Sequence, residues 1–280
     1  MKNQIKVMSF NLRMDTEHDG INRFRNRIGR IMEVINAENP DVIGFQEVTD
    51  YMRGVMRENL KGYTVVGCGR NKELKDEAML IAFKHDDCEL ISLDNVWLSC
   101  TPKIFGSRYG GDQSGCPRMY TTVRLKHKNV DTCFNFVNTH LDHEGENARY
   151  LGAVQIAQAI SQSDEKFVLT GDFNATPDAP EIQVITDKLA YRGAIDATKD
   201  LGVTFHAFGK WEKERWVKID YIFTDGKCIE SHKVEDIMED GKYYSDHNAV
   251  VAVIAKLAKR KRPNRKKKRT NPVRYTKSLP

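Results

Sequence analysis

Residues 167–177 read Phe-Val-Leu-Thr-Gly-Asp-Phe-Asn-Ala-Thr-Pro. The run Phe167–Thr170 is rich in strand-forming apolar residues, which predicts a buried β-strand. Asp172 and Asn174 follow this strand almost at once. Polar side chains at the end of a buried strand lie at the edge of a sheet, where ligands bind in α/β proteins. This stretch therefore predicts a strand that leads into a functional site.

Polar residues end several other predicted strands in the same way. Asn11 follows the strand predicted over Gln4–Phe10, and Gln46 and Glu47 follow the strand predicted over Val42–Phe45. Further such residues are His140 and Asp142 after Cys133–Asn138, Asp220 within Lys218–Phe223, and Asp246 with His247 before Ala249–Ile254. One such residue is usually a turn or capping residue, but this many carboxylates, amides and histidines indicate one shared ligand site.

The remaining predicted elements indicate a fold with more strands than helices. Apolar residues recur with helical spacing from Phe24 to Ile35, and Asn39-Pro40 stops that helix. Many links between strands are too short for parallel crossovers, which favours a mixed sheet, or two sheets packed face to face under outer helices. The further predicted strands are Tyr63–Val66, Ala78–Phe83, Leu90–Leu98 and Tyr120–Leu125, and the further helices are Asp50–Leu60, Asn147–Ile160 and Ala179–Leu189.

Length and composition place the chain among ordinary globular proteins. It has 280 residues, of which 40% are hydrophobic and 30% charged, and this excludes a collagen-like or wholly disordered chain. No apolar run approaches the ~18 residues of a membrane span, and the first residues lack the apolar core of a signal peptide. We therefore expect a cytoplasmic protein, or a nuclear one if the host is eukaryotic. The 6 cysteines form no Cys-x-x-Cys pair, which favours buried free thiols.

The net charge of +5 conceals an uneven distribution. Residues 256–280 contain 12 lysines and arginines and no acidic residue, which leaves 32 basic and 39 acidic residues in residues 1–255. We therefore predict one folded domain over residues 1–255 and a disordered basic tail over residues 256–280. Such a tail favours polyanions such as nucleic acid, but it is also typical of a nuclear-import signal or of a tether to anionic membranes.

The motifs that are missing narrow the chemistry. The chain has no Gly-x-x-x-x-Gly-Lys-Ser/Thr phosphate loop and no Gly-x-Ser-x-Gly nucleophile, and Gly67-Cys68-Gly69 lacks the third glycine of a dinucleotide site. The oxygen-rich residues at the strand ends suit Mg²⁺ or Mn²⁺ better than zinc, which indicates metal-assisted hydrolysis of a phosphoester. A zinc cluster at His140 and His143 with Asp142 is the alternative, although no third soft ligand has a recognisable spacing.

Six short motifs stand in the order and rough spacing of a known superfamily. They are Ser9-Phe10-Asn11, Gly44-Phe45-Gln46-Glu47, Asn138-Thr139-His140-Leu141, Gly171-Asp172-Phe173-Asn174-Ala175-Thr176-Pro177, Ile219-Asp220-Tyr221-Ile222 and Ser245-Asp246-His247-Asn248. With these motifs the chain resembles the endonuclease/exonuclease/phosphatase superfamily, which is deoxyribonuclease I-like. The resemblance implies a four-layer α/β sandwich, with two mixed β-sheets packed face to face and flanked by helices, and it makes residues 1–255 the catalytic domain.

The resemblance also implies a role for each motif. Glu47 is similar to the principal Mg²⁺ ligand, with Asn11 beside it and Asp246 as a second metal ligand; Mn²⁺ could replace Mg²⁺. The implied catalytic residues are Asp172, which orients or deprotonates the attacking water; Asn174, which holds a phosphate oxygen; His247, paired with Asp220 and facing the scissile phosphate; and His140, which donates to a phosphate oxygen or the leaving group. Arg118 is expected to contact the substrate phosphate, and Glu77 to steady His140.

Two loops bear on the substrate. Residues 103–115 carry Arg108, and residues 204–218 carry Trp211 and Trp216, which could stack on bases or could fill the core under a loop. Together with the basic tail they favour a monomeric Mg²⁺-dependent nuclease. A phosphatase or phosphodiesterase for a small-molecule, sugar or lipid phosphate is the alternative. A catalytically silent nucleic-acid-binding protein is disfavoured, because every expected catalytic position carries a competent residue.

Overall fold

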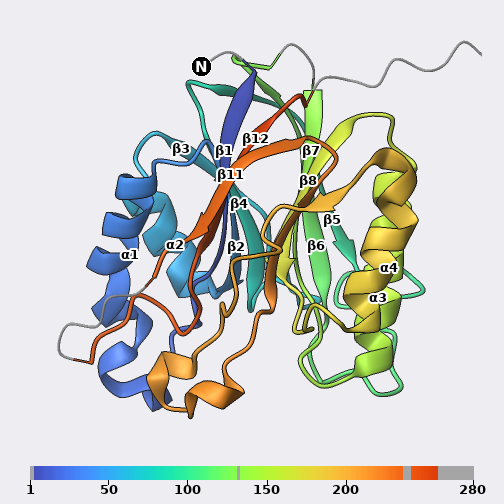
Figure 1. Ribbon diagram of the computed structural model, residues 1–280. Coiled ribbons are helices and arrows are strands. Elements are labelled where there is room, and N and C mark those ends of the chain that lie inside the picture. Colours follow the sequence, from blue (N-terminus) through green and yellow to red (C-terminus); the bar gives the residue numbers. More distant parts are fainter. Residues whose placement is uncertain (1–2, 131–132, 236–240, 258–280) are drawn as a thin grey trace, which may run out of the picture.

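Two six-stranded β-sheets pack face to face, and helices cover the outer face of each (Figure 1). The computed structural model describes residues 3–130, 133–235 and 241–257. The strand orders are β11-β12-β1-β2-β4-β3 and β5-β6-β7-β8-β10-β9. Each sheet combines parallel and antiparallel pairs, so the predicted α/β sandwich of two mixed sheets is confirmed.

The first sheet lies beneath two helices. Its parallel pair is β1 with β2, and β1 also pairs antiparallel with β12. The bounds of its strands are β1 Gln4–Asn11, β2 Val42–Val48, β3 Tyr63–Val66, β4 Ala78–Lys84, β11 Lys227–Lys233 and β12 Val250–Ala255, and those of its helices are α1 Phe24–Glu38 and α2 Asp50–Asn59. Helix α1 ends where the sequence predicts, because Asn39 adopts a left-handed φ of 47° ahead of Pro40 and its N–H bonds back to the Ile35 carbonyl.

The second sheet lies beneath the other two α-helices, on the right in Figure 1. Its parallel pair is β7 with β8, and β8 pairs antiparallel with β10. The bounds are β5 Cys88–Trp97, β6 Met119–His127, β7 Cys133–His140, β8 Lys166–Asp172, β9 Ile195–Asp196, β10 Asp220–Thr224, α3 Glu146–Ser161 and α4 Pro180–Leu189. Short 3-10 helices span Glu17–Asn22, Ala190–Arg192, Ala207–Gly209 and Lys213–Arg215.

Three predicted features need correction. Strand β2 continues to Val48, so Gln46 and Glu47 lie inside the strand and do not follow it. The edge strands β9 and β11 were missed: β9 has only two residues, and β11 is mostly polar and exposed, so it shows no apolar alternation. The cysteines are free as expected, but among them only Cys88 is buried.

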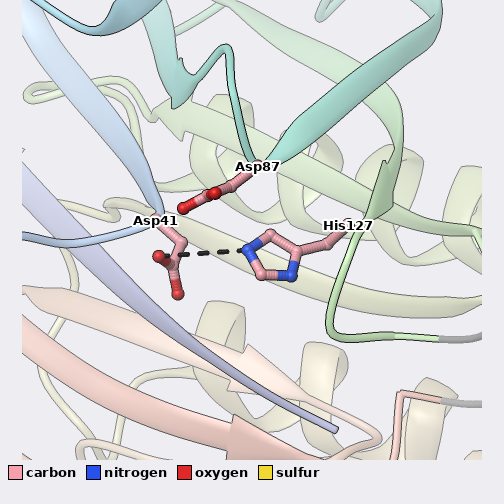
Figure 2. Close-up of side chains that lie close together, drawn as sticks. All are labelled: Asp41, Asp87 and His127. Atoms are coloured by element: carbon pink, nitrogen blue, oxygen red, sulfur yellow. Dashed lines mark ion pairs between the residues drawn. The ribbon is translucent and has the colours of Figure 1, made fainter. Parts of the chain in front are cut away.

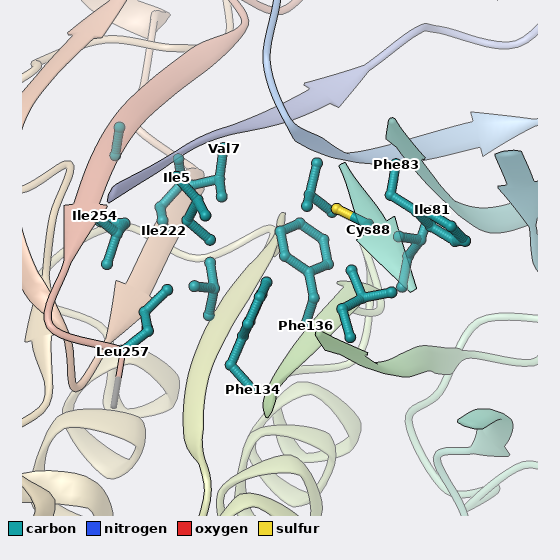
Figure 3. Packing of buried hydrophobic residues seen from close by; sticks show 14 of the residues in the cluster. Ile5, Val7, Ile81, Phe83, Cys88, Phe134, Phe136, Ile222, Ile254 and Leu257 are labelled. Carbon is teal, nitrogen blue, oxygen red and sulfur yellow. The ribbon is translucent and has the colours of Figure 1, made fainter. Parts of the chain in front are cut away.

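The core between the sheets explains why these strands are apolar along their length. Side chains of a strand alternate between its two faces. In β1, Ile5 and Val7 point toward the second sheet, where they join Phe134 and Phe136 of β7 (Figure 3). The intervening Met8 packs instead under α1 and α2. Both faces of the strand are therefore buried.

Asn138 links the two sheets near the end where the polar motifs gather. This residue belongs to β7, yet its side-chain amide donates to the carbonyls of Phe45 and Leu80 on the first sheet, at 2.8 and 3.0 Å. Its Oδ1 accepts from Gln46 Nε2 at 2.6 Å and from the Thr170 hydroxyl at 3.1 Å. All four contacts are buried, so the amide fixes the relative position of the sheets.

The described chain is still packed slightly beyond the predicted domain boundary. Leu257 is buried in the core between the sheets. Residues 258–280, which make up nearly all of the predicted basic tail, lie outside the described residues. Within the described part of the chain, no helix has the length and apolar character needed to cross a membrane.

Replacing Asn138 by alanine is expected to lower the free energy of unfolding by about 3 kcal/mol, because several buried partners lose their hydrogen bonds. Urea denaturation measures this loss. The matched control is Asn135→Ala on the same strand, where the amide is only part-buried and donates to the Ser163 hydroxyl at 2.9 Å. Equal losses in both variants would contradict a special role for Asn138.

Candidate active site

The pairing of three strands brings three of the expected catalytic residues into one row. In the second sheet, His140 of β7 lies opposite Asp172 of β8. On the other side of β8, Asp172 lies opposite Asp220 of β10. Residues opposite each other on paired strands have neighbouring side chains. Strand register alone therefore gathers an imidazole and two carboxylates.

The first sheet contributes Glu47 through an irregularity in β2. The pairing of β2 with β4 shifts register between Phe45 and Val48, and Glu47 adopts a left-handed φ of 60°. Left-handed backbone is strained for a residue with a long side chain, and such strain gathers at functional sites. Arg13 and Asn174 also have positive φ values, of 53° and 47°. The backbone is thus bent at three points around the site.

Asn11 joins the two halves of the site. Its Nδ2 donates to Glu47 Oε1 at 3.1 Å and to Asp172 Oδ2 at 3.0 Å, so one amide connects carboxylates from both sheets. The other carboxylate oxygen of Glu47 accepts the backbone N–H of Met14 at 3.0 Å. The second oxygen of Asp172 accepts the backbone N–H of Asn174 at 2.9 Å. Both carboxylates are therefore held in fixed orientations.

The loop before β12 brings Asp246 and His247 to the same place. His247 Nδ1 lies 2.8 Å from Asp220 Oδ2, and its Nε2 lies 3.7 Å from Asp172 Oδ2. Asp246 Oδ2 lies 3.8 Å from the guanidinium of Arg13. The structure thus brings together all eight residues that the resemblance assigns to catalysis or metal binding: Asn11, Glu47, His140, Asp172, Asn174, Asp220, Asp246 and His247.

Six of these eight residues line a cavity of about 400 Å³; Asn11 and Asp220 are not among its lining residues in the described chain. Most of the expected catalytic and metal-binding side chains line it, together with Arg13 and Arg70, which the sequence analysis did not single out. The remaining lining residues are Met14, Glu77, Cys116, Arg118, His143, Phe205, Trp211 and Ile219.

The two site histidines differ in charge. Burial alone would lower the pKa of His247, but Asp220, Asp172 and Asp246 outweigh it and raise the pKa to about 10, so the ring is a cation at neutral pH. Burial and the nearby arginines hold the pKa of His140 well below its usual range, so this ring is neutral. Asn174 Nδ2 lies 3.0 Å from His140 Nε2, which makes that nitrogen the acceptor.

The carboxylates of the site are crowded. Burial, Asp220 and Glu47 raise the pKa of Asp172 to about 7, against the opposing effect of the His247 cation. Burial and Glu47 also raise the pKa of Asp246. Burial would raise the pKa of Glu47 as well, but Arg13 and His247 outweigh it and hold that pKa below its usual range. Glu47 therefore stays ionised beside two carboxyls that resist ionisation.

This excess of negative charge suits a divalent cation. Four acidic side chains, of Glu47, Asp172, Asp220 and Asp246, face two cationic ones, of Arg13 and His247. Ligand atoms of Glu47, Asp172 and His247 lie within 4.8 Å of one another. The cationic His247 cannot bind a metal, but carboxylate and amide oxygens are the ligands that Mg²⁺ prefers. The residues present thus fit the metal that the sequence predicts.

Two arginines form the opposite wall of the cavity. Arg118 donates to Asp142 at 3.3 Å and lies 2.7 Å from His143 Nδ1, while its Nη1 is buried and has no partner among the described residues. Arg70 forms a two-pronged ion pair with Glu77, at 2.8 and 2.9 Å.

The expected support of His140 by Glu77 is not a hydrogen bond. Glu77 Oε2 lies 3.9 Å from His140 Nδ1, and its carboxylate is turned to Arg70. Arg70 carries no motif, so nothing in the sequence pointed to it. The zinc alternative is not supported, because Asp142 accepts the N–H groups of Glu144 and Gly145 in its own loop and of Ser114 in another loop.

The three residues considered for nucleic-acid binding lie in different settings. Trp211 is 40% exposed and lines the cavity, where its ring meets Phe205 at 5.2 Å. Trp216 is half-buried, and its indole N–H donates to the Trp211 carbonyl at 2.9 Å. Arg108 is exposed, and the residues that line this cavity within the described chain do not include it. Only Trp211 is therefore placed to touch a substrate in the cavity.

A second group of two carboxylates and a histidine lies at the other end of the sheets. It consists of Asp41, Asp87 and His127 (Figure 2). Lys84 donates to Asp41 at 3.1 Å, and Lys128 pairs with Asp87, so both charges are already balanced. His127 Nδ1 accepts the N–H of Asn129 at 3.1 Å, which leaves the proton of a neutral ring on Nε2. That nitrogen has no lone pair for a metal, so this group is an ion-pair network.

Comparisons with known proteins agree with this geometry. A family model of the Endonuclease/Exonuclease/phosphatase family matches residues 8–247. A Bacteroides vulgatus endonuclease/exonuclease/phosphatase is 28% identical, with a TM-score of 0.84 over 92% of this chain and 100% of that one. The mannosyl-6-phosphatase Bt3783 of Bacteroides thetaiotaomicron VPI-5482 is 23% identical, with a TM-score of 0.79 over 90% of this chain and 99% of that one.

A more distant likeness has a nucleic-acid ligand. TDP2 of D. rerio, solved with a single-stranded DNA product, is 14% identical, with a TM-score of 0.72 over 90% of this chain and 99% of that one. At these identities, TDP2 and the mannosyl-6-phosphatase share the fold with this chain and show nothing further. The family match spans most of the sequence and includes all eight converging residues. The protein therefore belongs to the endonuclease/exonuclease/phosphatase family, whose enzymes are phosphoester hydrolases and generally depend on a divalent metal.

Proposed function

We propose that this protein is a Mg²⁺-dependent hydrolase that takes a small or terminal phosphate ester into its cavity. The observation that carries the proposal is the cluster of three carboxylates, of Glu47, Asp172 and Asp246, that line one cavity of about 400 Å³. This volume lies in the lower part of the range of about 300–1,000 Å³ that is typical of small-ligand sites. Mn²⁺ is expected to replace Mg²⁺.

In this proposal Glu47, Asn11 and Asp246 hold the metal ion. The ion supplies positive charge to a phosphate oxygen. Asn11 would contribute its Oδ1, which also accepts the backbone N–H of Arg13 at 2.9 Å, while its Nδ2 donates to Glu47 and Asp172. Arg13, whose guanidinium lies 3.9 Å from Glu47 and 3.8 Å from Asp246, balances the remaining charge of these ligands.

In the proposed hydrolysis, side chains of the protein accept the proton of the attacking water and donate hydrogen bonds to the phosphate. With a pKa of about 7, Asp172 can accept a proton from the attacking water near neutral pH. His247 stays cationic through Asp220 and presents its Nε2–H to the phosphate. Asn174 and the neutral His140 lie beside Asp172, where Asn174 Nδ2 donates to His140 Nε2 and to the Leu141 carbonyl; Asn174 would exchange one of these bonds for a phosphate oxygen. Fixed donors of this kind lower the barrier because they need no reorganisation during the reaction.

The arginine wall supports a preference for strongly anionic substrates. The Nη1 of Arg118 is buried and has no partner among the described residues, and Arg118 lines the cavity together with His143 and Arg70. A buried donor without a partner is unfavourable and gains from an incoming acceptor. A phosphate oxygen is such an acceptor, so Arg118 is the side chain that we assign to substrate phosphate. Glu77 supports Arg70 in this wall.

A nuclease is the second candidate, and Trp211 is the observation that favours it. Its exposed ring borders the cavity and carries Arg215 at 4.6 Å, so a base could stack there. Residues 258–280, which we propose to be a basic tail outside the catalytic domain, would add affinity for a polymer. We also propose that the protein acts as a monomer.

Asp172→Asn is expected to lower the turnover of a phosphate ester by about 10²–10⁴-fold, the usual contribution of a general base. EDTA should abolish turnover in the wild type, and added Mg²⁺ should restore it. The control is Asp178→Asn, an exposed carboxylate six residues further on that accepts a bond from Thr176. Full turnover in EDTA would rule out the metal mechanism.

Asp220→Asn is expected to shift the pH dependence of turnover. Asp220 is the largest of the charges that raise the pKa of His247 to about 10, so its loss lets burial lower that pKa. If the cation is needed, the variant loses turnover as the pH rises through the lowered pKa, while the wild type keeps the cation up to about pH 10. Imidazole NMR signals and pH–rate profiles report both changes. Superimposable profiles would exclude this role of His247.

A substrate panel separates the two candidate functions. Sugar and nucleoside monophosphates should release inorganic phosphate, and oligonucleotides with a 5′- or 3′-phosphate should lose only that phosphate. Trp211→Ala is expected to change the turnover of sugar phosphates by less than about threefold, since the ring is not needed for them. Internal cleavage of oligonucleotides that falls about tenfold in Trp211→Ala, and weakens further when residues 258–280 are removed, would favour the nuclease instead.

A further inference from the structure

The guanidinium of Arg27, in α1, is a buried cation that is surrounded by backbone oxygens. The residue is 1% exposed. Its Nη1 and Nη2 donate to the carbonyls of Leu12 and Arg13 at 2.9 Å each. Its Nη1 also donates to the Tyr244 carbonyl, and its Nε donates to the Asn22 carbonyl. Four backbone carbonyls thus share one guanidinium.

Three of these carbonyls, of Leu12, Arg13 and Tyr244, belong to the segments that carry the proposed metal ligands. Leu12 and Arg13 follow Asn11 directly, and Tyr244 lies two residues before Asp246. The same two segments also meet through the Ser245 hydroxyl, which donates to the Asn11 carbonyl at 2.6 Å. Arg27 therefore bridges the chain on either side of the metal site.

The partners of the Arg27 side chain are backbone carbonyls and not a carboxylate. In the described part of the chain, no carboxylate pairs with Arg27, although a buried cation is costly without one. Its guanidinium lies over the rings of Phe24 and Phe208, at 5.8 and 5.6 Å. Phe208 belongs to the same loop as Trp211, which lines the cavity. Arg27 therefore also contacts the loop that carries Trp211.

We propose that Arg27 is a positioning residue that sets the distance between Asn11 and Asp246 and so tunes the affinity of the metal site. The inference rests on the proposed function, which assigns those two residues to the metal. A planar guanidinium can reach carbonyls of several segments at once, whereas a lysine ammonium is a single point with three donors. Arg27 touches neither substrate nor metal and acts through the backbone.

The test is a calorimetric titration of Mn²⁺ into the full-length wild type, Arg27→Lys and Arg27→Met. Partners that orient metal ligands contribute about 10–100-fold to metal affinity, so we expect at least a tenfold weaker affinity in Arg27→Lys, and no smaller loss in Arg27→Met. The matched control is Arg192→Met. Arg192 is also buried and donates to the carbonyls of Ile160, Ser163 and Glu165, at the far end of β8 from Asp172; unlike Arg27 it also pairs with a carboxylate, that of Asp225, at 3.0 Å.

Thermal unfolding of the same variants separates positioning from general stability. We expect Arg192→Met to lower the melting temperature while leaving the Mn²⁺ affinity unchanged. A folded Arg27→Lys with wild-type Mn²⁺ affinity would overturn the proposal, even if Arg27→Met does not fold. An equal loss of affinity in Arg192→Met would also overturn it. A wild-type protein that binds no Mn²⁺ would instead refute the metal site itself, and with it the proposed function.

Discussion

The buried amide of Asn138 is the contact on which the site depends, because the chemistry is divided between two sheets. Asn138 forms a polar network with Ser9, Gln46 and Thr170, one residue from each of four strands. Ser9, Asn138 and Thr170 each stand two residues before a site residue, namely Asn11, His140 and Asp172. Side chains two apart on a strand share a face. The network therefore lies directly beneath the catalytic groups and supports them.

The close approach of the two sheets at Asn138 requires a glycine at position 44. A Cβ atom built on Gly44 would lie 2.6 Å from Asn138 Oδ1 and 2.8 Å from its Cγ, well inside van der Waals contact. Any larger residue would push β2 away from β7, and Glu47 lies three residues further along β2. A packing requirement between the sheets is thus also a requirement on the distance between Glu47 and Asp172.

Charge is the second constraint, and it explains the opposite states of the two histidines. His247 lies among Asp220, Asp172 and Asp246 and is held as a cation, whereas His140 lies toward Arg118 and Arg70 and is held neutral. The cavity consequently has an acidic side and an arginine side. A phosphate ester would fit between these two sides, with its oxygens near a metal ion at the acidic side and near the arginine donors at the other side. Catalysis then depends on arrangement more than on any single strong acid or base.

The sequence predicted the parts of the fold and site that rest on local pattern. Most strands were found because both of their faces are buried, and Asp172, His247 and Glu47 were found because they stand in short motifs. Residues that act through long-range contacts were missed: Arg70, Arg27 and the role of Asn138 depend on which carbonyl or carboxylate the fold brings to them. Glu77 lies 3.9 Å from His140, but its carboxylate pairs with Arg70, a partner that no motif indicated.

The most direct test of this account is a crystal of the protein soaked in Mn²⁺ and measured for anomalous scattering. The account requires a strong peak among Asn11, Glu47 and Asp246, with Asp172 facing it across the cavity. A peak at Asp41, Asp87 and His127, or no peak in a well-ordered crystal, would contradict the assignment of metal chemistry to this site.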